Sequence, residues 1–178
     1  MTITVRPVEL PNDRERILAL DRSFVTDRIY HVSRTTMSFS LEEVRVNPPL
    51  LKQLPLDYDL GEGRAWDDGL VAELDGVIAG FAAWKHEAWN RSTVLWHLYV
   101  ASGSRGRGIG RQLIELVIDH ARAARSRAVW LETSSVNAPA IAFYTHLGFT
   151  FCGLDTALYD PASPASGETA LYFVYPLE

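Results

Sequence analysis

The sequence has a single cysteine, Cys152, among 178 residues, so the chain cannot form an internal disulfide bond. No group of Cys and His residues has the spacing of a zinc site, and no metal is expected. No apolar run approaches the roughly 20 residues that a membrane-spanning helix needs. The first residues, Met1 to Arg6, lack the pattern of a signal peptide. These absences predict a cytoplasmic protein that does not interact with membranes.

An excess of positive charge is also missing. The chain has 17 Lys and Arg residues against 22 Asp and Glu residues, a formal net charge of −5. This balance argues against general nucleic-acid binding and weakly favours a cationic partner. What the sequence does have is apolar residues, 47% of the total, which is enough for a substantial core. We therefore expect one globular domain over residues 1–178.

The predicted elements follow the order of a mixed α/β fold. Asn12 or Asp13 is expected to cap a first helix that ends near 22–25. Asn47-Pro48-Pro49 is expected to stop the third strand, ahead of a polar connector at 50–63. Asp75-Gly76 is expected to form a hairpin turn, Asn137 is expected to cap the last helix, and Leu116 is expected on the apolar side of the helix before it. With the apolar periodicity, these signals predict strands at 2–8, 28–32, 37–46, 70–74, 77–85, 92–100, 128–133, 149–158 and 169–175, and two later helices at 109–124 and 138–147.

A glycine-rich loop separates the strand that ends at Val100 from the helix that begins near Ile109. It reads Arg105-Gly106-Arg107-Gly108-Ile109-Gly110. Glycines let the backbone approach a ligand, and the first amides of a helix are donors at its positive end, so a phosphate or pyrophosphate fits there. An ordinary tight connection is the alternative interpretation. The loop is not a P-loop, because no Gly-Lys-Ser/Thr follows, and the antiparallel strands before it argue against a dinucleotide-binding fold.

A second block of motifs lies downstream of this loop. It consists of Val129-Trp130-Leu131-Glu132-Thr133, Asn137-Ala138-Pro139-Ala140, Phe143-Tyr144 and Gly148-Phe149. Together with the loop, it resembles the GNAT superfamily of acyl-CoA-dependent N-acetyltransferases over roughly residues 70 to 158. Two branches look similar. One is the streptothricin acetyltransferases, which also resemble the tail Gly153-Leu154-Asp155, Leu158-Tyr159 and Glu168-Thr169-Ala170-Leu171-Tyr172. The other is the ribosomal-protein N-terminal acetyltransferases, and the tail favours the first.

The resemblance implies a GNAT fold, with a central, mostly antiparallel and splayed sheet flanked by helices, and acetyl-CoA as cofactor. It also implies that Asn137 contacts the cofactor arm, and that the strand before the loop carries a bulge. The residues implied to hold the CoA pyrophosphate by their backbone amides are Arg105, Gly106, Arg107, Gly108, Ile109 and Gly110. Those implied to pair by their backbone with the pantetheine arm are Leu98, Tyr99 and Val100.

The same resemblance assigns two catalytic roles. Glu132 is expected to be the general base that takes the proton of the attacking amine, and burial in an apolar strand would raise its pKa as that role requires. Tyr144 is expected to donate a proton to the departing thiolate. Many relatives place an acid in the strand before the loop, where this chain has Trp96-His97, so His97 is a second candidate base. A histidine that makes one structural hydrogen bond is the alternative.

The acceptor is expected to be a primary amine on a small cationic or polyamine compound such as a streptothricin-like antibiotic. A protein N-terminus or lysine, and a CoA-binding module with little catalysis, are alternatives, and a homodimer is common among relatives of this kind. Acidic residues crowd the connector and form either a solvated loop or a rim that attracts a cationic substrate: Asp57, Asp59, Glu62, Asp67 and Asp68. Trp84, Trp89 and Trp96 are expected to pack in the core, with stacking of one of them on a substrate cation as the alternative. Cys152 is expected to be a packed strand residue.

Overall fold

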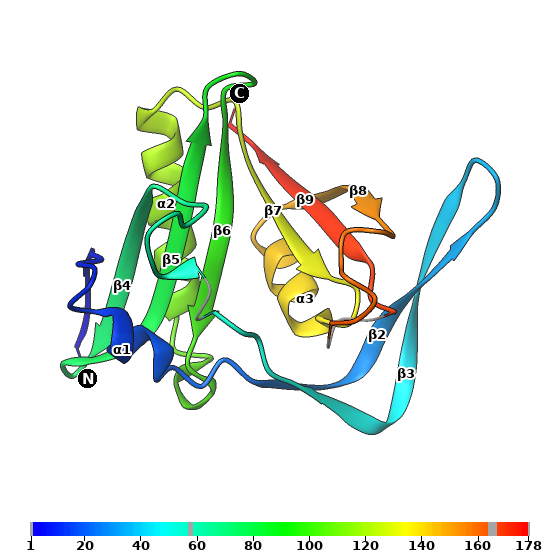
Figure 1. Ribbon diagram of the computed structural model, residues 1–178, viewed down its shortest axis with the longest axis horizontal. Coiled ribbons are helices and arrows are strands. Elements are labelled where there is room, and N and C mark those ends of the chain that lie inside the picture. Colours follow the sequence, from blue (N-terminus) through cyan, green and yellow to red (C-terminus); the bar gives the residue numbers. More distant parts are fainter. Residues whose placement is uncertain (1, 57–58, 164–166, 178) are drawn as a thin grey trace. The chain divides into compact units, whose positions relative to one another are not determined.

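The computed structural model describes residues 2–56, 59–163 and 167–177, and its elements follow the predicted order (Figure 1). The fold is mixed α/β with a mostly antiparallel sheet, as predicted. The elements are β1 (Ile3–Pro7), α1 (Arg14–Leu18), β2 (Phe24–Arg34), β3 (Phe39–Lys52), β4 (Asp68–Leu74), β5 (Val77–Glu87), β6 (Ser92–Val100), α2 (Ile109–Ala123), β7 (Ala128–Ser134), α3 (Ala138–His146), β8 (Thr150–Asp155) and β9 (Ala170–Pro176).

These elements form two units, each assembled from separated segments of the chain. The first comprises Met1–Ser23, Gln53–Trp130 and Pro176–Glu178, and the second comprises Phe24–Lys52 and Leu131–Tyr175. Strand β7 therefore begins in the first unit and ends in the second. The single domain expected over 1–178 stays a prediction.

The first unit is built on an antiparallel meander of β1, β4, β5 and β6. Asp75 and Gly76 join β4 to β5 with left-handed φ angles of 51° and 84°, the backbone of the two-residue hairpin turn that the Asp-Gly pair predicts. Helix α2 packs on β5 and β6. Its apolar stripe is buried, whereas Leu116, expected on that stripe, is 38% exposed.

The contact between α2 and β5 depends on Gly80. A Cβ atom at Gly80 would lie 2.7 Å from a methyl carbon of Ile109 and 3.0 Å from one of Leu113. A larger residue would therefore push the helix off the sheet. Gly80 also pairs with Val100, the last residue of β6, and Ala101 N donates to Ala79 O at 2.9 Å. The same point of β5 thus fixes both ends of the glycine-rich loop.

Strand β6 carries the expected bulge, at Trp96. Ala83 pairs with His97 and Trp84 pairs with Leu95, so Trp96 is the extra residue of β6. The prediction that the three tryptophans pack in the core holds for Trp84, which is 3% exposed, but it is wrong for Trp96 at 46% and Trp89 at 84%. The bulge turns Trp96 outward, and Trp89 lies in the turn between β5 and β6.

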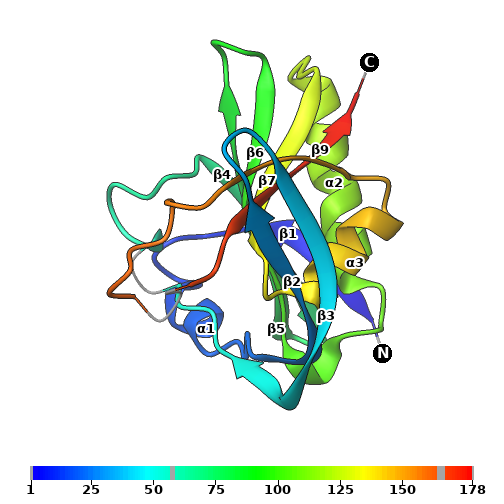
Figure 2. The same cartoon turned by 90° about the vertical axis from the view of Figure 1, so that its right-hand side faces the viewer.

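In the second unit, β2 and β3 form a long antiparallel hairpin, drawn in blue and cyan in Figure 2. The prediction that Asn47-Pro48-Pro49 stops the strand is wrong, because β3 continues to Lys52. Thr26 pairs with Leu50 and Arg28 with Arg45, so the two prolines lie in a bulge where no ladder amide is required.

The remainder of the second unit contains α3, β8, β9 and the end of β7. Asn137 caps α3 as predicted, since its side-chain oxygen accepts a hydrogen bond from Ala140 N at 3.3 Å. Gly148 follows the helix with a left-handed φ of 94°. Strand β8 ends at Asp155, earlier than expected, and Cys152 is exposed on it rather than packed.

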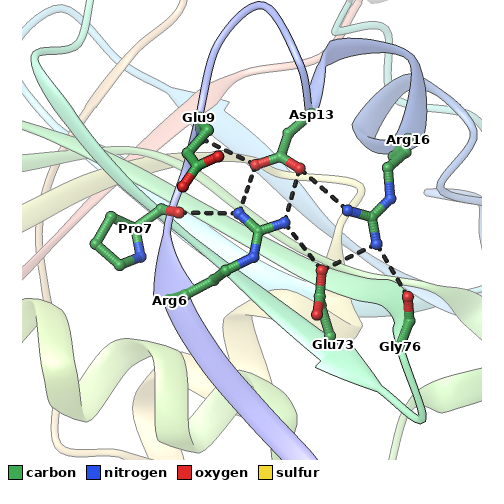
Figure 3. A network of polar contacts seen from close by, with 7 residues as sticks. All are labelled: Arg6, Pro7, Glu9, Asp13, Arg16, Glu73 and Gly76. Atoms are coloured by element: carbon green, nitrogen blue, oxygen red, sulfur yellow. Dashed lines mark hydrogen bonds and ion pairs between the residues drawn. The ribbon is translucent and has the colours of Figure 1, made fainter.

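Helix α1 is shorter than predicted and ends at Leu18. Asp13 is at its N-cap position, but its side chain does not cap the helix. Both carboxylate oxygens instead bind Arg6, at 2.7 and 2.8 Å, and Arg16 and Glu73 complete an ion network between β1, α1 and β4 (Figure 3). The Arg6 guanidinium lowers the pKa of Asp13 to about 2. This network attaches α1 to the meander.

Replacing Asp13 tests this attachment. Asp13→Asn removes the charge that Arg6 and Arg16 share, and we expect a loss of about 2 kcal/mol in the free energy of unfolding at pH 7, measured by urea denaturation. Because the pKa of Asp13 is lowered in the folded state, its contribution is complete above about pH 4 and disappears as the pH falls toward about 2. The difference between the two proteins should therefore shrink in that interval.

Glu15→Gln is the matched control. The Glu15 carboxylate is 81% exposed and pairs with Arg14 on the surface of the same helix, so its removal should leave stability almost unchanged. Equal effects of the two substitutions would contradict a structural role of the Asp13 network.

Candidate active site

The candidate site residues are distributed over both units. The first unit holds His97, the end of β6 at Leu98–Val100 and the glycine-rich loop, which leads into Ile109 and Gly110 at the start of α2. The second unit holds Glu132 on β7, Asn137 at the cap of α3 and Tyr144 within α3.

The loop has the geometry of an anion cradle. After a short 3₁₀ turn at Ser102–Ser104, Gly106 and Gly108 adopt left-handed φ angles of 76° and 85°, and no side chain caps α2. A Cβ atom at either glycine would meet no other atom within 4 Å, so the space above the loop is open. Open, left-handed glycines at the N-terminus of a fifteen-residue helix suit the pyrophosphate of CoA.

Contacts on both sides of the 3₁₀ turn fix the loop. Ser102 donates its amide to Asp21 O at 2.9 Å and its hydroxyl to the Asp21 carboxylate. Hydrogen bonds from Ser102 and Ser23 lower the pKa of Asp21 to about 2. Arg105 Nε donates to Val100 O at 3.2 Å. The loop is therefore ordered by the chain itself.

His97 is buried and held by a residue far away in the sequence. Its Nε2 lies 2.6 Å from Asp59 Oδ2, and its ring stacks between Phe81 and Tyr99. The Tyr99 hydroxyl lies 3.4 Å from Nδ1. Burial lowers the pKa of His97, and the bond to Asp59 opposes this shift. A neutral imidazole that donates to Asp59 and faces a phenol with its other nitrogen satisfies these contacts.

Asp59 corrects the prediction for the acidic connector. It is buried, its Oδ1 accepts from Ala65 N at 2.8 Å, and its carbonyl accepts from Trp66 Nε1 at 2.9 Å. It therefore belongs to neither a solvated loop nor an acidic rim. Glu62, Asp67 and Asp68 are exposed as expected, and Asp57 lies outside the described residues.

In the second unit, Glu132 meets Tyr159. Strand β7 alternates in burial, with Leu131 and Thr133 buried and Glu132 and Ser134 on the less buried face. Glu132 Oε1 accepts a hydrogen bond from the Tyr159 hydroxyl. Desolvation by burial raises the pKa of Glu132, as predicted, and the bond from Tyr159 works in the opposite direction.

Ser134, on the same face of β7 as Glu132, makes a second polar contact. Ser134 donates its hydroxyl to Glu168, whose other oxygen pairs with Lys52 on β3. Val136 N donates to the Ser134 hydroxyl at 3.2 Å. These contacts join β3, the end of β7 and the segment before β9 into one polar cluster.

Tyr144 packs on α3 as a mostly buried ring. It is 8% exposed and lies 5.5 Å from the ring of Phe143 and 5.7 Å from that of Phe149. A packed ring of this kind holds its hydroxyl in a fixed direction. Asn137 uses its side-chain oxygen for the helix cap, which leaves the amide group as the donor for a ligand.

Sequence reasoning did not assign Asp59, Tyr159 or Glu168 to the candidate site. Tyr159 and Glu168 lie in the tail that resembles the streptothricin acetyltransferases, and this resemblance was the signal that could have identified them. Asp59 had no signal that distinguished it from the neighbouring acids. Among the residues that the structure describes, no group of three His, Cys, Asp or Glu side chains could hold a metal ion, and no helix is long and apolar enough to span a membrane.

An open loop with left-handed glycines joins an antiparallel strand to a helix N-terminus, and a carboxylate with a raised pKa lies elsewhere on the fold. These features are typical of an α/β transferase that uses a phosphate-bearing donor. Comparison with known proteins agrees. Residues 34–149 match the Acetyltransferase (GNAT) family. The chain is 43% identical to the streptothricin acetyltransferase of Streptomyces lavendulae, an alignment that covers 93% of this chain and 91% of the relative.

Solved structures give the same result. The crystal structure of nourseothricin acetyltransferase matches with a TM-score of 0.90 and 42% identity over 100% of both chains. A Bacillus anthracis strain Ames protein assigned as a streptothricin acetyltransferase, in complex with acetyl coenzyme A, matches with a TM-score of 0.80 and 25% identity over 98% of this chain and 99% of the other. The chain belongs to the GNAT family, and it is an acetyl-CoA-dependent N-acetyltransferase.

The loop can be tested with two glycines of nearly equal φ. Gly108→Ala forces a side chain into the left-handed region and into the open space above the loop, and we expect affinity for CoA to fall about tenfold, measured by calorimetric titration. Gly76→Ala is the control, because Gly76 has φ 84° and open surroundings in the β4–β5 turn. Both variants should lose similar stability. Equal CoA affinities would refute the assignment of the loop.

Proposed function

We propose that the enzyme acetylates a primary amine of a streptothricin-class antibiotic. The observation that carries this proposal is the similarity to the Streptomyces lavendulae enzyme, which extends over nearly the whole of both chains rather than over the cofactor-binding part alone. A cytoplasmic location and a homodimer stay predictions.

We propose Glu132 as the general base. Its raised pKa makes the carboxylate a stronger base, and it lies on the less buried face of β7. His97 suits the role less well, because Nε2 lies against the Asp59 carboxylate and Nδ1 faces the Tyr99 hydroxyl. We assign His97 instead to holding the connector around Asp59 against β6.

The remaining roles follow from the same chain. When bound, acetyl-CoA supplies an acetyl thioester. Backbone amides of the loop, from Arg105 to Gly110, would hold its pyrophosphate, and the end of β6 and Asn137 would contact its arm. Glu132 removes a proton from the acceptor ammonium, which frees the nitrogen lone pair for attack on the thioester. Tyr144 donates its hydroxyl proton to the thiolate that departs.

The substrate proposal predicts a strong preference among amines. Purified enzyme with acetyl-CoA should acetylate nourseothricin with a kcat/KM at least about 10²-fold above that for peptides with a free N-terminus or a lysine, because binding energy from the rest of the molecule positions the amine. Thiol release and the mass of the product report the reaction. Turnover on the peptides alone would replace the antibiotic with a protein acceptor, and CoA binding without any turnover would leave only a binding module.

The base is tested by Glu132→Gln, which keeps the shape of the side chain and removes its proton-accepting charge. We expect kcat to fall by about 10²-fold or more, with CoA affinity unchanged. Glu43→Gln is a matched control, since Glu43 is a half-exposed carboxylate in the same unit that also accepts from a phenol, Tyr30, at 3.3 Å. Normal turnover of Glu132→Gln would remove Glu132 from the mechanism.

A further inference from the structure

Tyr159 is the one inward-facing residue of an exposed segment. Thr156, Ala157, Leu158 and Asp160 are all exposed, with Leu158 at 49%, whereas Tyr159 is partly buried. Two side-chain turns flank it: Asp155 Oδ1 accepts from Ala157 N at 2.7 Å, and Asp160 Oδ1 accepts from Ala162 N at 2.8 Å. The segment after β8 is therefore folded so that this one phenol reaches back to β7.

We propose that Tyr159 is the positioning residue of Glu132: its hydroxyl holds the carboxylate in one orientation and stabilises the ionised form, which sets the pH at which the enzyme becomes active. This inference rests on the proposed role of Glu132 as the base. The contact joins residues 27 positions apart, from β7 and from an otherwise exposed segment.

Burial has the largest effect on the Glu132 carboxylate and raises its pKa, and the hydrogen bond from Tyr159 is the contact that opposes this effect. Ser134, the last residue of β7, also hydrogen-bonds to the Tyr159 hydroxyl. Tyr172 on β9 lies near Glu132, whose charge raises the pKa of Tyr172. Burial, with the Glu132 charge and the bond to it, also raises the pKa of Tyr159 itself, so the phenol stays a donor. It cannot compete with Glu132 for the role of base.

The other charged side chains of the polar cluster are Lys52 and Glu168, which pair with each other, and Asp155. Lys52 on β3 and Glu168 form an ion pair, and they contribute little net charge at Glu132. Asp155 on β8 acts on Tyr172. Removing the Tyr159 hydroxyl therefore removes the group that favours ionisation of Glu132, while the desolvation that disfavours ionisation remains.

Tyr159→Phe should move the acidic limb of the kcat/KM profile upward by about one to two pH units, because a hydrogen bond to a charged group is lost. A large part of the activity lost near pH 6 should return near pH 9. In the free protein, the Glu132 side-chain carboxyl carbon, followed by ¹³C NMR, should titrate at a pH raised by the same amount. A merely structural role would lower activity equally at every pH.

Tyr30→Phe is the matched control, because it removes a phenol from a half-exposed carboxylate, Glu43, in the same unit. Neither its pH profile nor the Glu132 titration should move.

If Glu132→Gln is inactive and Tyr159→Phe leaves the acidic limb and the Glu132 titration in place, this inference is wrong and the proposed base stands. If Glu132→Gln is fully active, the proposed base is wrong, whatever Tyr159→Phe does. Circular dichroism of each variant checks that it is folded. Tyr159→His keeps a donor at this position, so its acidic limb should lie between those of the unchanged enzyme and Tyr159→Phe.

Discussion

The close contact of α2 with β5 at Gly80 is the constraint on which the first unit depends. With only a hydrogen atom at this position, Ile109 and Leu113 approach the sheet directly, and a Cβ atom would lie within 2.7 Å of Ile109. Ile109 is also the first residue of α2, and Gly80 pairs with the last residue of β6. The loop between these two points is therefore held at both ends by one residue of β5. Its own glycines can then adopt left-handed angles in open space without loosening the fold.

Buried polar groups in both units follow one principle. His97 and Glu132 lie on strands at positions where burial disfavours their charged forms, and each meets a partner from an irregular segment, Asp59 or Tyr159. A buried polar group without a partner would cost the protein stability, so each pair also fixes its irregular segment in place. In the proposed mechanism, the same contacts that stabilise these segments determine the protonation of the candidate bases.

Much of the fold could be predicted because its signals are local. The Asp75-Gly76 turn, the Asn137 cap and the start of α2 at Ile109 each depend on a few adjacent residues, and each is present where expected. The errors occurred where tertiary contacts override such signals. Asp13 binds Arg6 instead of capping α1, and β3 continues past Pro48 and Pro49 because the hairpin has a bulge there.

The candidate site divides in the same way. The sequence by itself determined the glycine loop, the buried environment expected for Glu132 and the family resemblance, because these depend on residue type and short-range spacing. Only the tertiary structure decided that Trp96 turns outward at a bulge, that Asp59 is buried against His97, and that Tyr159 reaches Glu132. These pairs are separated by 38 and 27 residues. A carboxylate or a phenol looks the same in a sequence whether it is solvated or buried, and its environment is set only when distant segments pack together.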